Sequence, residues 1–179
     1  PEDKLASRDR YGFSVIHHQN FGHGLIGMLN LNGVSDDDYF SDLSTRVAQV
    51  SQGNLLRQGT LSYGGPWYGA TLNVQSYQTL LGLAKPYQRL PQLTGVANRY
   101  DLPFGLAMNL NAEYVDFDHP TSVIAKRTTL YPQLSLPFVH PAFNFIPKIG
   151  LHATQYVLNN QPAANDPTNI SRVMPTVTV

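Results

Sequence analysis

Apolar and polar residues alternate along much of this chain. The clearest stretch is 68–80, where Tyr, Ala, Leu and Val occupy positions 68, 70, 72 and 74, and Gly, Thr, Asn and Gln occupy positions 69, 71, 73 and 75. Successive side chains of a β-strand point to opposite faces, so this pattern predicts a strand with one apolar and one polar face. Similar alternation covers residues 104–117, 130–138 and 143–153, and weaker strand-like runs cover residues 11–20, 25–34, 55–63 and 90–100. A last run, residues 172–179, has the character of a strand that has been cut off.

The connections between these runs are expected to alternate in length. Short turns are predicted at residues 21–24, 64–66, 101–103 and 139–141, and long polar loops at residues 35–53, 81–89, 118–127 and 159–171. In an antiparallel meander, every second connection lies on the same edge of the sheet. The pattern therefore predicts an all-β fold, an antiparallel transmembrane β-barrel segment. It would be a meander of about eight to nine strands with short periplasmic turns and long external loops.

One proline interrupts this pattern. Pro147 lies inside the predicted strand 143–153. Proline cannot donate a hydrogen bond to a β-ladder and is confined to strand starts, sheet edges and bulges. We therefore expect a bulge or a local distortion at Pro147.

Aromatic residues lie next to the predicted short turns. In a transmembrane barrel such residues form a girdle at the membrane interface, and the apolar faces between the turns span roughly 9–11 residues, as a tilted membrane strand requires. The alternative is that aromatic residues flank turns in any β-protein, with no membrane involved. The predicted interfacial aromatics are Trp67, Tyr68, Phe104, Phe138 and Phe143.

The composition removes several classes of function. Charged residues make up only 13% of the chain, about half the usual share. Twelve basic and twelve acidic residues give no net charge, so the chain lacks the basic excess expected of a nucleic-acid partner. The absence of cysteine excludes thiolate zinc sites and disulfides within these residues. No apolar run reaches the roughly 18–20 residues that a membrane helix needs.

Catalytic and metal-binding motifs are also missing from the sequence. There is no Gly-x-Ser-x-Gly motif and no phosphate-binding loop, so we expect no enzymatic activity, no catalytic residue and no cofactor. His17 and His18 are adjacent, and on a strand they would point to opposite faces, which does not suit a shared metal ion. We therefore expect no metal site.

Several segments, taken in order, carry a resemblance to a known family. They are GVSDDDYFSDLS at residues 33–44, the Pro-Gln-Leu triplets at 91–93 and 132–134, KRTTLYPQLSLP at 126–137 and LHATQY at 151–156. This series resembles the barrel of the lipopolysaccharide-assembly LptD (OstA/Imp) family.

The resemblance implies a fold, a location and partners. Members of the family have a periplasmic jellyroll followed by a large barrel in the bacterial outer membrane. They take lipopolysaccharide from a periplasmic bridge and deliver it to the outer leaflet, and an LptE-like lipoprotein plugs the barrel. By this resemblance residues 1–10 would be a lead-in segment. Residues 11–179 would be a partial barrel domain, truncated at its C-terminal end and lacking the jellyroll.

The loop after residue 34 contains an acidic motif with two possible roles. Its acidic residues could contact anionic lipopolysaccharide through bridging cations at the outer surface. Alternatively, the loop is simply solvated, and its two aromatic residues anchor it by packing. The residues of this external-loop motif are Asp36, Asp38, Tyr39, Phe40 and Asp42.

The polar faces of the predicted strands would face the barrel lumen. They could line a hydrated path for sugar, contact the plug protein, or only keep the interior wet. The lumen-facing candidates are Thr71, Asn73, Gln75, Asn109, Asn111, Glu113, Gln133, Lys148 and His152.

Two other architectures fit parts of the pattern. A small closed outer-membrane barrel, or a porin-like protein, needs about eight strands. A soluble carbohydrate-binding β-sandwich would explain the abundance of Asn, Gln and Tyr, but its strands should be shorter, roughly five or six residues.

Overall fold

The computed structural model describes residues 2–3, 8–43, 53–80, 82–163 and 165–179. The predicted lead-in 1–10 and the predicted loops 35–53, 81–89 and 159–171 therefore lie partly outside the described residues, at 1, 4–7, 44–52, 81 and 164.

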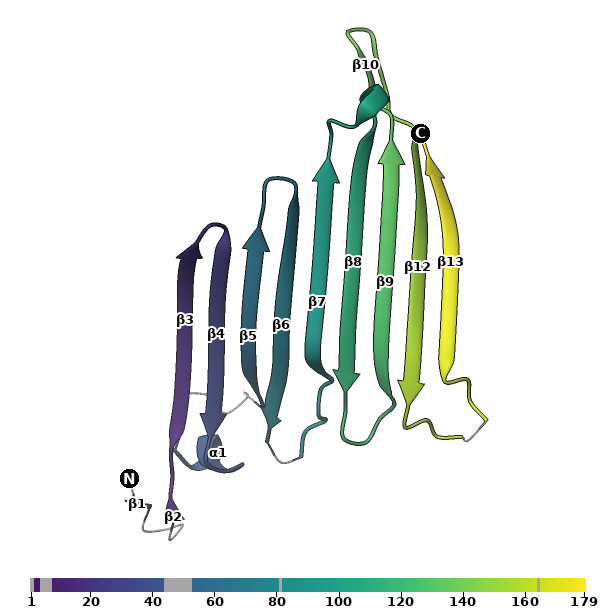
Figure 1. The fold of residues 1–179 in the computed structure, drawn as a ribbon. Coiled ribbons are helices and arrows are strands. Elements are labelled where there is room, and N and C mark those ends of the chain that lie inside the picture. Colours follow the sequence, from purple (N-terminus) through teal and green to yellow (C-terminus); the bar gives the residue numbers. More distant parts are fainter. Residues whose placement is uncertain (1, 4–7, 44–52, 81, 164) are drawn as a thin grey trace.

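Nine antiparallel strands form one open sheet in the described part of the chain, and each pairs with the next of these nine along the sequence (Figure 1). Each strand has 10 to 12 residues. This confirms the predicted all-β meander of about eight to nine strands. The strands, in sheet order, are β3 (Gly12–Gly22), β4 (Leu25–Val34), β5 (Asn54–Gly64), β6 (Tyr68–Thr79), β7 (Gln88–Arg99), β8 (Ala107–Asp118), β9 (Ile124–Ser135), β12 (Lys148–Asn159) and β13 (Asn169–Thr178).

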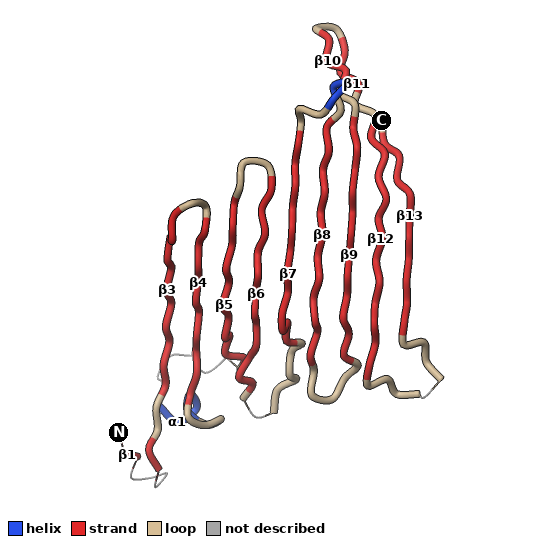
Figure 2. The backbone as a smooth tube through the Cα atoms, viewed as in Figure 1, coloured by secondary structure: helices blue, strands red, loops and turns tan. Residues whose placement is uncertain are grey.

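The sheet is a single layer, and within the described residues no second large sheet covers either face (Figure 2). The β-sandwich alternative is therefore wrong for this part of the chain, because a sandwich consists of two packed sheets. Strands β3 and β13 are the two edges, and they are not paired with each other. Two short pairs lie outside the sheet. One joins β1 (Glu2–Asp3) with β2 (Arg8–Asp9), and the other joins β10 (Phe138–His140) with β11 (Phe143–Phe145).

The connections lie alternately at the two ends of the strands, as predicted, but their lengths do not alternate strictly. The predicted long loop 118–127 is wrong in extent, because β9 begins at Ile124 and leaves only residues 119–123 between strands. On the opposite edge, the predicted short turn 139–141 is the tip of a longer segment, residues 136–147. We call the end of the sheet with the β3–β4 and β5–β6 turns the short-turn edge, and the opposite end the loop edge.

The β10–β11 hairpin projects beyond the sheet at the short-turn edge (Figure 1). Pro147 separates β11 from β12, so the predicted strand 143–153 is interrupted where we expected a distortion. Strand β11 ends before this break and β12 begins after it. At the break, the Leu136 amide donates a hydrogen bond to the Pro147 carbonyl at 3.1 Å.

Two other predicted strand boundaries are wrong. Phe104 does not begin a strand but lies in the turn η1 (Pro103–Gly105) with a φ of 64°, and β8 begins after it. The predicted fragment 172–179 is part of a ten-residue strand, β13, that pairs with β12 from Asn169 onwards. A helix, α1 (Tyr39–Leu43), occupies part of a segment that we predicted as a loop.

Tight turns at the short-turn edge depend on glycine. Gly24 follows β3 with a φ of +81°, a conformation that L-residues with a side chain rarely adopt. A Cβ atom there would lie 2.1 Å from the Gly64 carbonyl oxygen, and the Gly64 amide donates to the Gly24 carbonyl at 2.8 Å. The β3–β4 and β5–β6 turns are therefore held side by side.

A small hydrophobic core lies at the loop edge rather than on a sheet face. Val34, Leu55 and Leu80 are buried there, and Tyr39 and Phe40 of α1 pack against them. The helix thus covers the ends of β4, β5 and β6. Among the residues that the structure describes, no helix has the length and apolarity needed to cross a membrane.

Candidate functional site

The two faces of the sheet differ in chemistry, and strand pairing shows which residues share a face. Asn73 pairs with Thr60 on β5 and Gln92 on β7, and Glu113 pairs with Thr94 and Thr129. Paired residues point to the same side of a sheet. By this criterion one face, which we call the polar face, carries all nine of the predicted polar positions, namely Thr71, Asn73, Gln75, Asn109, Asn111, Glu113, Gln133, Lys148 and His152.

A chain of side-chain hydrogen bonds crosses the polar face over five strands. Gln58 on β5 donates to Asn73 at 2.7 Å, and Asn73 donates to Gln92 at 3.4 Å. Gln92 on β7 donates in turn to Glu113 on β8 at 2.6 Å. Arg127 on β9 completes the chain with a 2.6 Å ion pair to the other Glu113 oxygen. Each of these five side chains thus has a hydrogen-bond or ion-pair partner within the protein.

The rest of the polar face carries smaller groups of polar contacts. Asn109 accepts a hydrogen bond from Asn111 at 2.7 Å and donates to Asn98. The Gln133 amide donates to the Tyr131 hydroxyl at 2.7 Å. The Tyr131 and His152 rings meet edge to face with centroids 5.2 Å apart. A shallow hollow of about 380 Å³ lies beside this ring pair and Glu113.

The opposite face, which we call the apolar face, carries aliphatic side chains on every strand of the sheet. Within the described residues no layer of protein packs against this face, and its side chains remain well exposed, Leu130 at 45% for example. Representative residues on successive strands are Val15, Leu29, Leu61, Leu72, Leu93, Leu110, Leu130, Leu151 and Val173.

The separation of the faces is weakest at strands β3 and β4. Ile16 and Met28 lie on the polar face, where Ile16 pairs with Asn30 and Met28 pairs with Thr60. His17 lies on the apolar face, because it pairs with Leu29. His17 and His18 therefore point to opposite faces, as the sequence predicts.

The five predicted interfacial aromatics all lie at the short-turn edge, but they do not form one ring of strand residues. Trp67 and Tyr68 flank the β5–β6 turn with ring centroids 4.8 Å apart. Phe104 projects from η1 and is 94% exposed. Phe138 and Phe143 belong to the β10–β11 hairpin, beyond the end of the sheet.

A cationic residue accompanies the aromatic pair at this edge. The Arg99 guanidinium lies over the Trp67 ring, 5.8 Å from its centroid. Arg99 also forms a 3.0 Å ion pair with Asp101 in the following turn. The hydrogen bond from Arg99, together with its positive charge, lowers the pKa of the Asp101 carboxyl.

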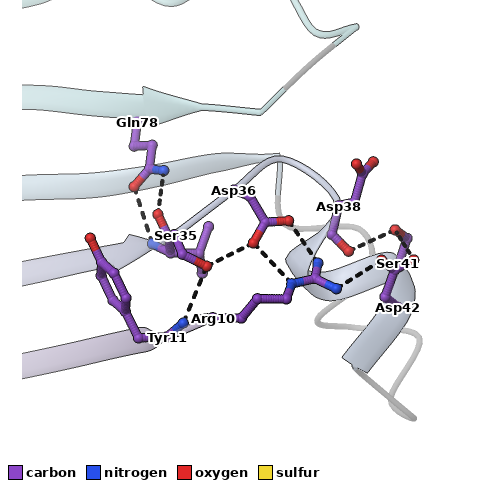
Figure 3. A network of polar contacts seen from close by, with 9 residues as sticks. Arg10, Tyr11, Ser35, Asp36, Asp38, Ser41, Asp42 and Gln78 are labelled. Carbon is purple, nitrogen blue, oxygen red and sulfur yellow. Dashed lines mark hydrogen bonds and ion pairs between the residues drawn. The ribbon is translucent and has the colours of Figure 1, made fainter. Parts of the chain in front are cut away.

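At the loop edge, the acidic motif is organised around one arginine that the sequence analysis did not identify (Figure 3). The Arg10 guanidinium donates two hydrogen bonds to the Asp36 carboxylate, at 2.6 and 3.0 Å, and a third to Asp42 at 2.9 Å. Both side chains of the Arg10–Asp36 pair are buried, with 2% and 8% exposed. We call this the Arg10 clasp. It ties the start of β3 to the segment after β4.

Further contacts fix the same corner. Ser35 donates to Asp36 at 2.7 Å, and the Tyr39 ring lies 5.9 Å from the Arg10 guanidinium carbon. Gln78 on β6 binds both backbone groups of Val34, at 3.1 and 2.8 Å. The backbone carbonyl of Asp38 accepts hydrogen bonds from the Ser41 hydroxyl and from the Asp42 amide. Tyr39 and Phe40 pack against the buried residues Val34, Leu55 and Leu80.

Several residues of these networks were missed by sequence analysis, among them Arg10, Gln92 and Arg127. Arg10 lies in the predicted lead-in, 26 residues from Asp36, and no local pattern connects them. Gln92 and Arg127 are polar-face residues in strands whose alternation is weak near their ends. Their parity relative to Thr94 and Thr129 was the only signal that would have placed them.

The comparisons with known proteins agree with this architecture. A family model described as LptD, LPS transport system D, matches residues 8–179. The LPS-assembly protein LptD of Aromatoleum aromaticum is 47% identical over the whole of this chain, which covers 23% of that protein. Those of an Azoarcus species and of Chromobacterium violaceum are 45% and 41% identical over 99% and 89% of this chain, which covers 23% and 21% of them. The chain thus spans less than a quarter of these relatives, and it belongs to the LptD family.

Proposed function

We propose that residues 11–179 form part of the wall of an outer-membrane β-barrel that inserts lipopolysaccharide into the outer leaflet. One observation carries the proposal: nine consecutive strands form a single layer with one aliphatic and one polar face. A tilted strand of roughly 9–11 residues spans a bilayer, and these strands have 10 to 12. Lipopolysaccharide is proposed as the cargo because the relatives are named LPS-assembly protein LptD.

The apolar face would lie against lipid. Contiguous exposed apolar surface of this extent is unfavourable in water, whereas acyl chains satisfy it at no cost. The ladder hydrogen bonds between strands satisfy the backbone, as a bilayer requires. Closure of the barrel would need strands beyond β3 and β13, which the longer relatives have the length to supply.

The polar face would line the lumen. Its Asn, Gln and Thr side chains present donors and acceptors with little net charge, which suits the passage of hydrated sugar. Glu113, near the middle of this face, is paired with Arg127. An LptE-like plug lipoprotein would contact the same face, and periplasmic bridge components would act through a jellyroll outside these residues. The proposed role involves no covalent step and no cofactor.

The loop edge would be external and the short-turn edge periplasmic, the usual asymmetry of bacterial barrels. The Arg10 clasp and the core beneath α1 would then hold the external loop in place. Trp67, Tyr68 and Phe104 would lie at the periplasmic interface, where aromatic rings are favoured.

Single-cysteine variants of the full-length protein in native membranes test the orientation of the faces. Leu110 and Leu130 on the apolar face are compared with Asn111 and Thr129, their neighbours on the polar face. We expect lipid-phase probes to label the first pair and a water-soluble thiol reagent to label the second. Equal reaction of both pairs with the aqueous reagent would contradict the proposal.

The cargo is tested separately. Depletion of the full-length protein should remove lipopolysaccharide from the cell surface and leave it in the periplasm or inner membrane. Normal surface lipopolysaccharide after depletion would refute the transport role, whatever the orientation of the strands.

A further inference from the structure

Arg57 is a charged residue on the apolar face of the sheet. It pairs with Leu31 on β4, and Leu31 pairs with Val15 on β3, which places all three side chains on this face. Arg57 is the fourth residue of β5 counted from the loop edge, roughly 10 Å from the end of the strand at about 3.3 Å per residue. An arginine at this position can lay its aliphatic stem along apolar surface while its guanidinium reaches toward the end of the sheet.

The two neighbouring strands hold this guanidinium in one orientation. Its Nε–H donates to the Asn32 carbonyl at 3.1 Å, and its Nη2 donates to the side-chain oxygen of Gln78 at 2.7 Å. Both acceptors lie nearer the loop edge than the residues that pair with Arg57. Gln78 is itself fixed by two hydrogen bonds to the backbone of Val34. The guanidinium is therefore directed toward the loop edge.

Gly33 leaves the space that this arrangement needs. It pairs with Phe13 on the apolar face. An added Cβ atom at Gly33 would lie 2.7 Å from the Phe13 ring and 3.0 Å from Nη2 of Arg57. We call Asn32, Gly33, Arg57 and Gln78 the Arg57 seat.

The charge of Arg57 has no counter-charge in the described part of the chain. Both acceptors of the seat are neutral, and Nη1 makes no hydrogen bond with a described residue. Other cations on strands of the apolar face have carboxylate partners. Lys126 lies 3.6 Å from Asp116, and Arg99 lies 3.0 Å from Asp101. Because an ionisable residue that faces a bilayer is costly unless it is paired, the seat calls for an anionic partner.

We propose that the Arg57 seat binds a phosphate group of a lipopolysaccharide molecule that lies in the outer leaflet, beside the barrel wall. The proposal rests on the proposed function, which turns the apolar face toward lipid and the loop edge toward the outside. The guanidinium then lies near the headgroups of a leaflet into which lipopolysaccharide is inserted, and the lipid part of lipopolysaccharide carries phosphate. Arginine binds phosphate oxygens through charge-assisted hydrogen bonds from a planar fork of donors. The bound molecule would be a resident lipid of the wall, outside the lumen.

A photoreactive side chain next to the seat identifies the lipid that occupies it. Ser76 pairs with Arg57 and shares its face, so benzoylphenylalanine in place of Ser76 lies beside the seat. Thr128 on β9, which lies on the same face two positions from Lys126, is the matched control. The full-length protein is illuminated in its native outer membrane and again after purification in a mild detergent. Adducts are identified by mass spectrometry.

Bulk lipid should reach both positions in the membrane, and only bound lipid should remain in detergent. We expect lipopolysaccharide adducts at Ser76 and at Thr128 in the membrane. In detergent we expect the adduct at Ser76 to exceed that at Thr128 by about tenfold, which corresponds to a preference of roughly 1.4 kcal/mol.

Two variants remove the unpaired charge in different ways. Arg57→Gln deletes the charge, whereas Gln78→Glu keeps the guanidinium and gives it a carboxylate partner within the protein. We expect both to reduce the Ser76 adduct in detergent to the level at Thr128. Lys126→Gln, which removes a cation that is already paired, should leave the Ser76 adduct unchanged. Electrophoretic mobility with and without heating shows that each variant is folded, and Gln78→Glu carries the test if Arg57→Gln does not fold.

The outcomes separate the phosphate site from the proposed function. A Ser76 adduct in detergent that persists in a folded Arg57→Gln or Gln78→Glu variant, or that never exceeds the adduct at Thr128, would overturn the phosphate site and leave the membrane-facing sheet intact. A phospholipid adduct at Ser76 in detergent would overturn lipopolysaccharide as the occupant. The absence of any lipid adduct at both positions in the native membrane would overturn the proposed function as well.

Discussion

Arg10 holds the loop edge together by exchanging solvation for three charge-assisted hydrogen bonds. Removing one partner of a buried ion pair leaves the other charge uncompensated and costs about 3 kcal/mol or more. We therefore expect Arg10→Ala to release the segment that contains α1. The measurement is limited proteolysis of the full-length protein in outer-membrane vesicles, with cleavage sites mapped between residues 35 and 43.

An exposed ion pair in the same sheet provides the control. Lys126 and Asp116 lie 3.6 Å apart with exposed fractions of 52% and 27%, and such pairs contribute less than about 1 kcal/mol. Lys126→Ala should leave the cleavage pattern unchanged. Equal protection of the segment in Arg10→Ala and in the unmodified protein would show that packing of Tyr39 and Phe40 holds the segment without the clasp.

Residue parity was predictable and residue partners were not. The side chains of Asn73 and Glu113 could be assigned to one face from sequence, because the period of two in a strand is a local property. Their partners, Gln92 and Arg127, depend on the register between strands, which no single run of sequence reveals. The same limit hid Arg10, whose role depends on a contact across 26 positions.

At the scale of elements, the strands with tight turns were predicted most closely. Strand β4 has the predicted bounds, and β6 differs by one residue. Two of the errors fall where proline or a side-chain contact outside the strand decides the structure. Pro147 splits one predicted strand and leaves a hairpin beyond the sheet. Helix α1 is too short to show a periodic pattern, and it is held by tertiary contacts with β4, β5 and β6.

Strand β9 offers a direct test of its two faces. Leu130 is at the middle of the strand on the apolar face, and Thr129 precedes it on the polar face opposite Glu113. Arginine on the lipid side of a barrel costs about 2–4 kcal/mol at the bilayer midplane, whereas a lumen position tolerates it. We expect Leu130→Arg to reduce the folded fraction of the full-length protein in membranes and Thr129→Arg to leave it nearly unchanged.

Electrophoretic mobility with and without heating measures the folded fraction of each variant, since unfolding of a barrel changes its migration. Leu130→Ala serves as the control for the loss of the leucine itself. A deficit as large in Thr129→Arg as in Leu130→Arg would show that both faces are equally dry, and the lumen assignment would fail.

At the scale of the whole molecule, the described residues form one large sheet with only a small hydrophobic core. Among the described residues, the buried hydrophobic cluster lies at the loop edge, and Val115 is the one large side chain that is fully buried. A globular domain of this length would bury most of its aliphatic residues. Here the strands present them on one face, so the stability of the sheet depends on what lies against that face. The proposed function supplies this environment, with a bilayer on one side of the sheet and water on the other.

This dependence predicts the behaviour of the 179-residue chain on its own. In plain buffer the apolar face and the unpaired strands β3 and β13 offer surfaces for self-association, because open strand edges pair readily with other chains. We expect the isolated chain to aggregate in buffer and to disperse in a mild detergent with β-structure retained. Size-exclusion chromatography and circular dichroism in the two media measure this.

The polar face should not cause the association, so arginine substitutions at Thr94 and Thr129 should leave it unchanged, whereas substitutions at Leu93 and Leu130 should reduce it. A soluble monomer in buffer would mean that the chain buries its apolar face against itself, and the membrane-facing role would have to be abandoned.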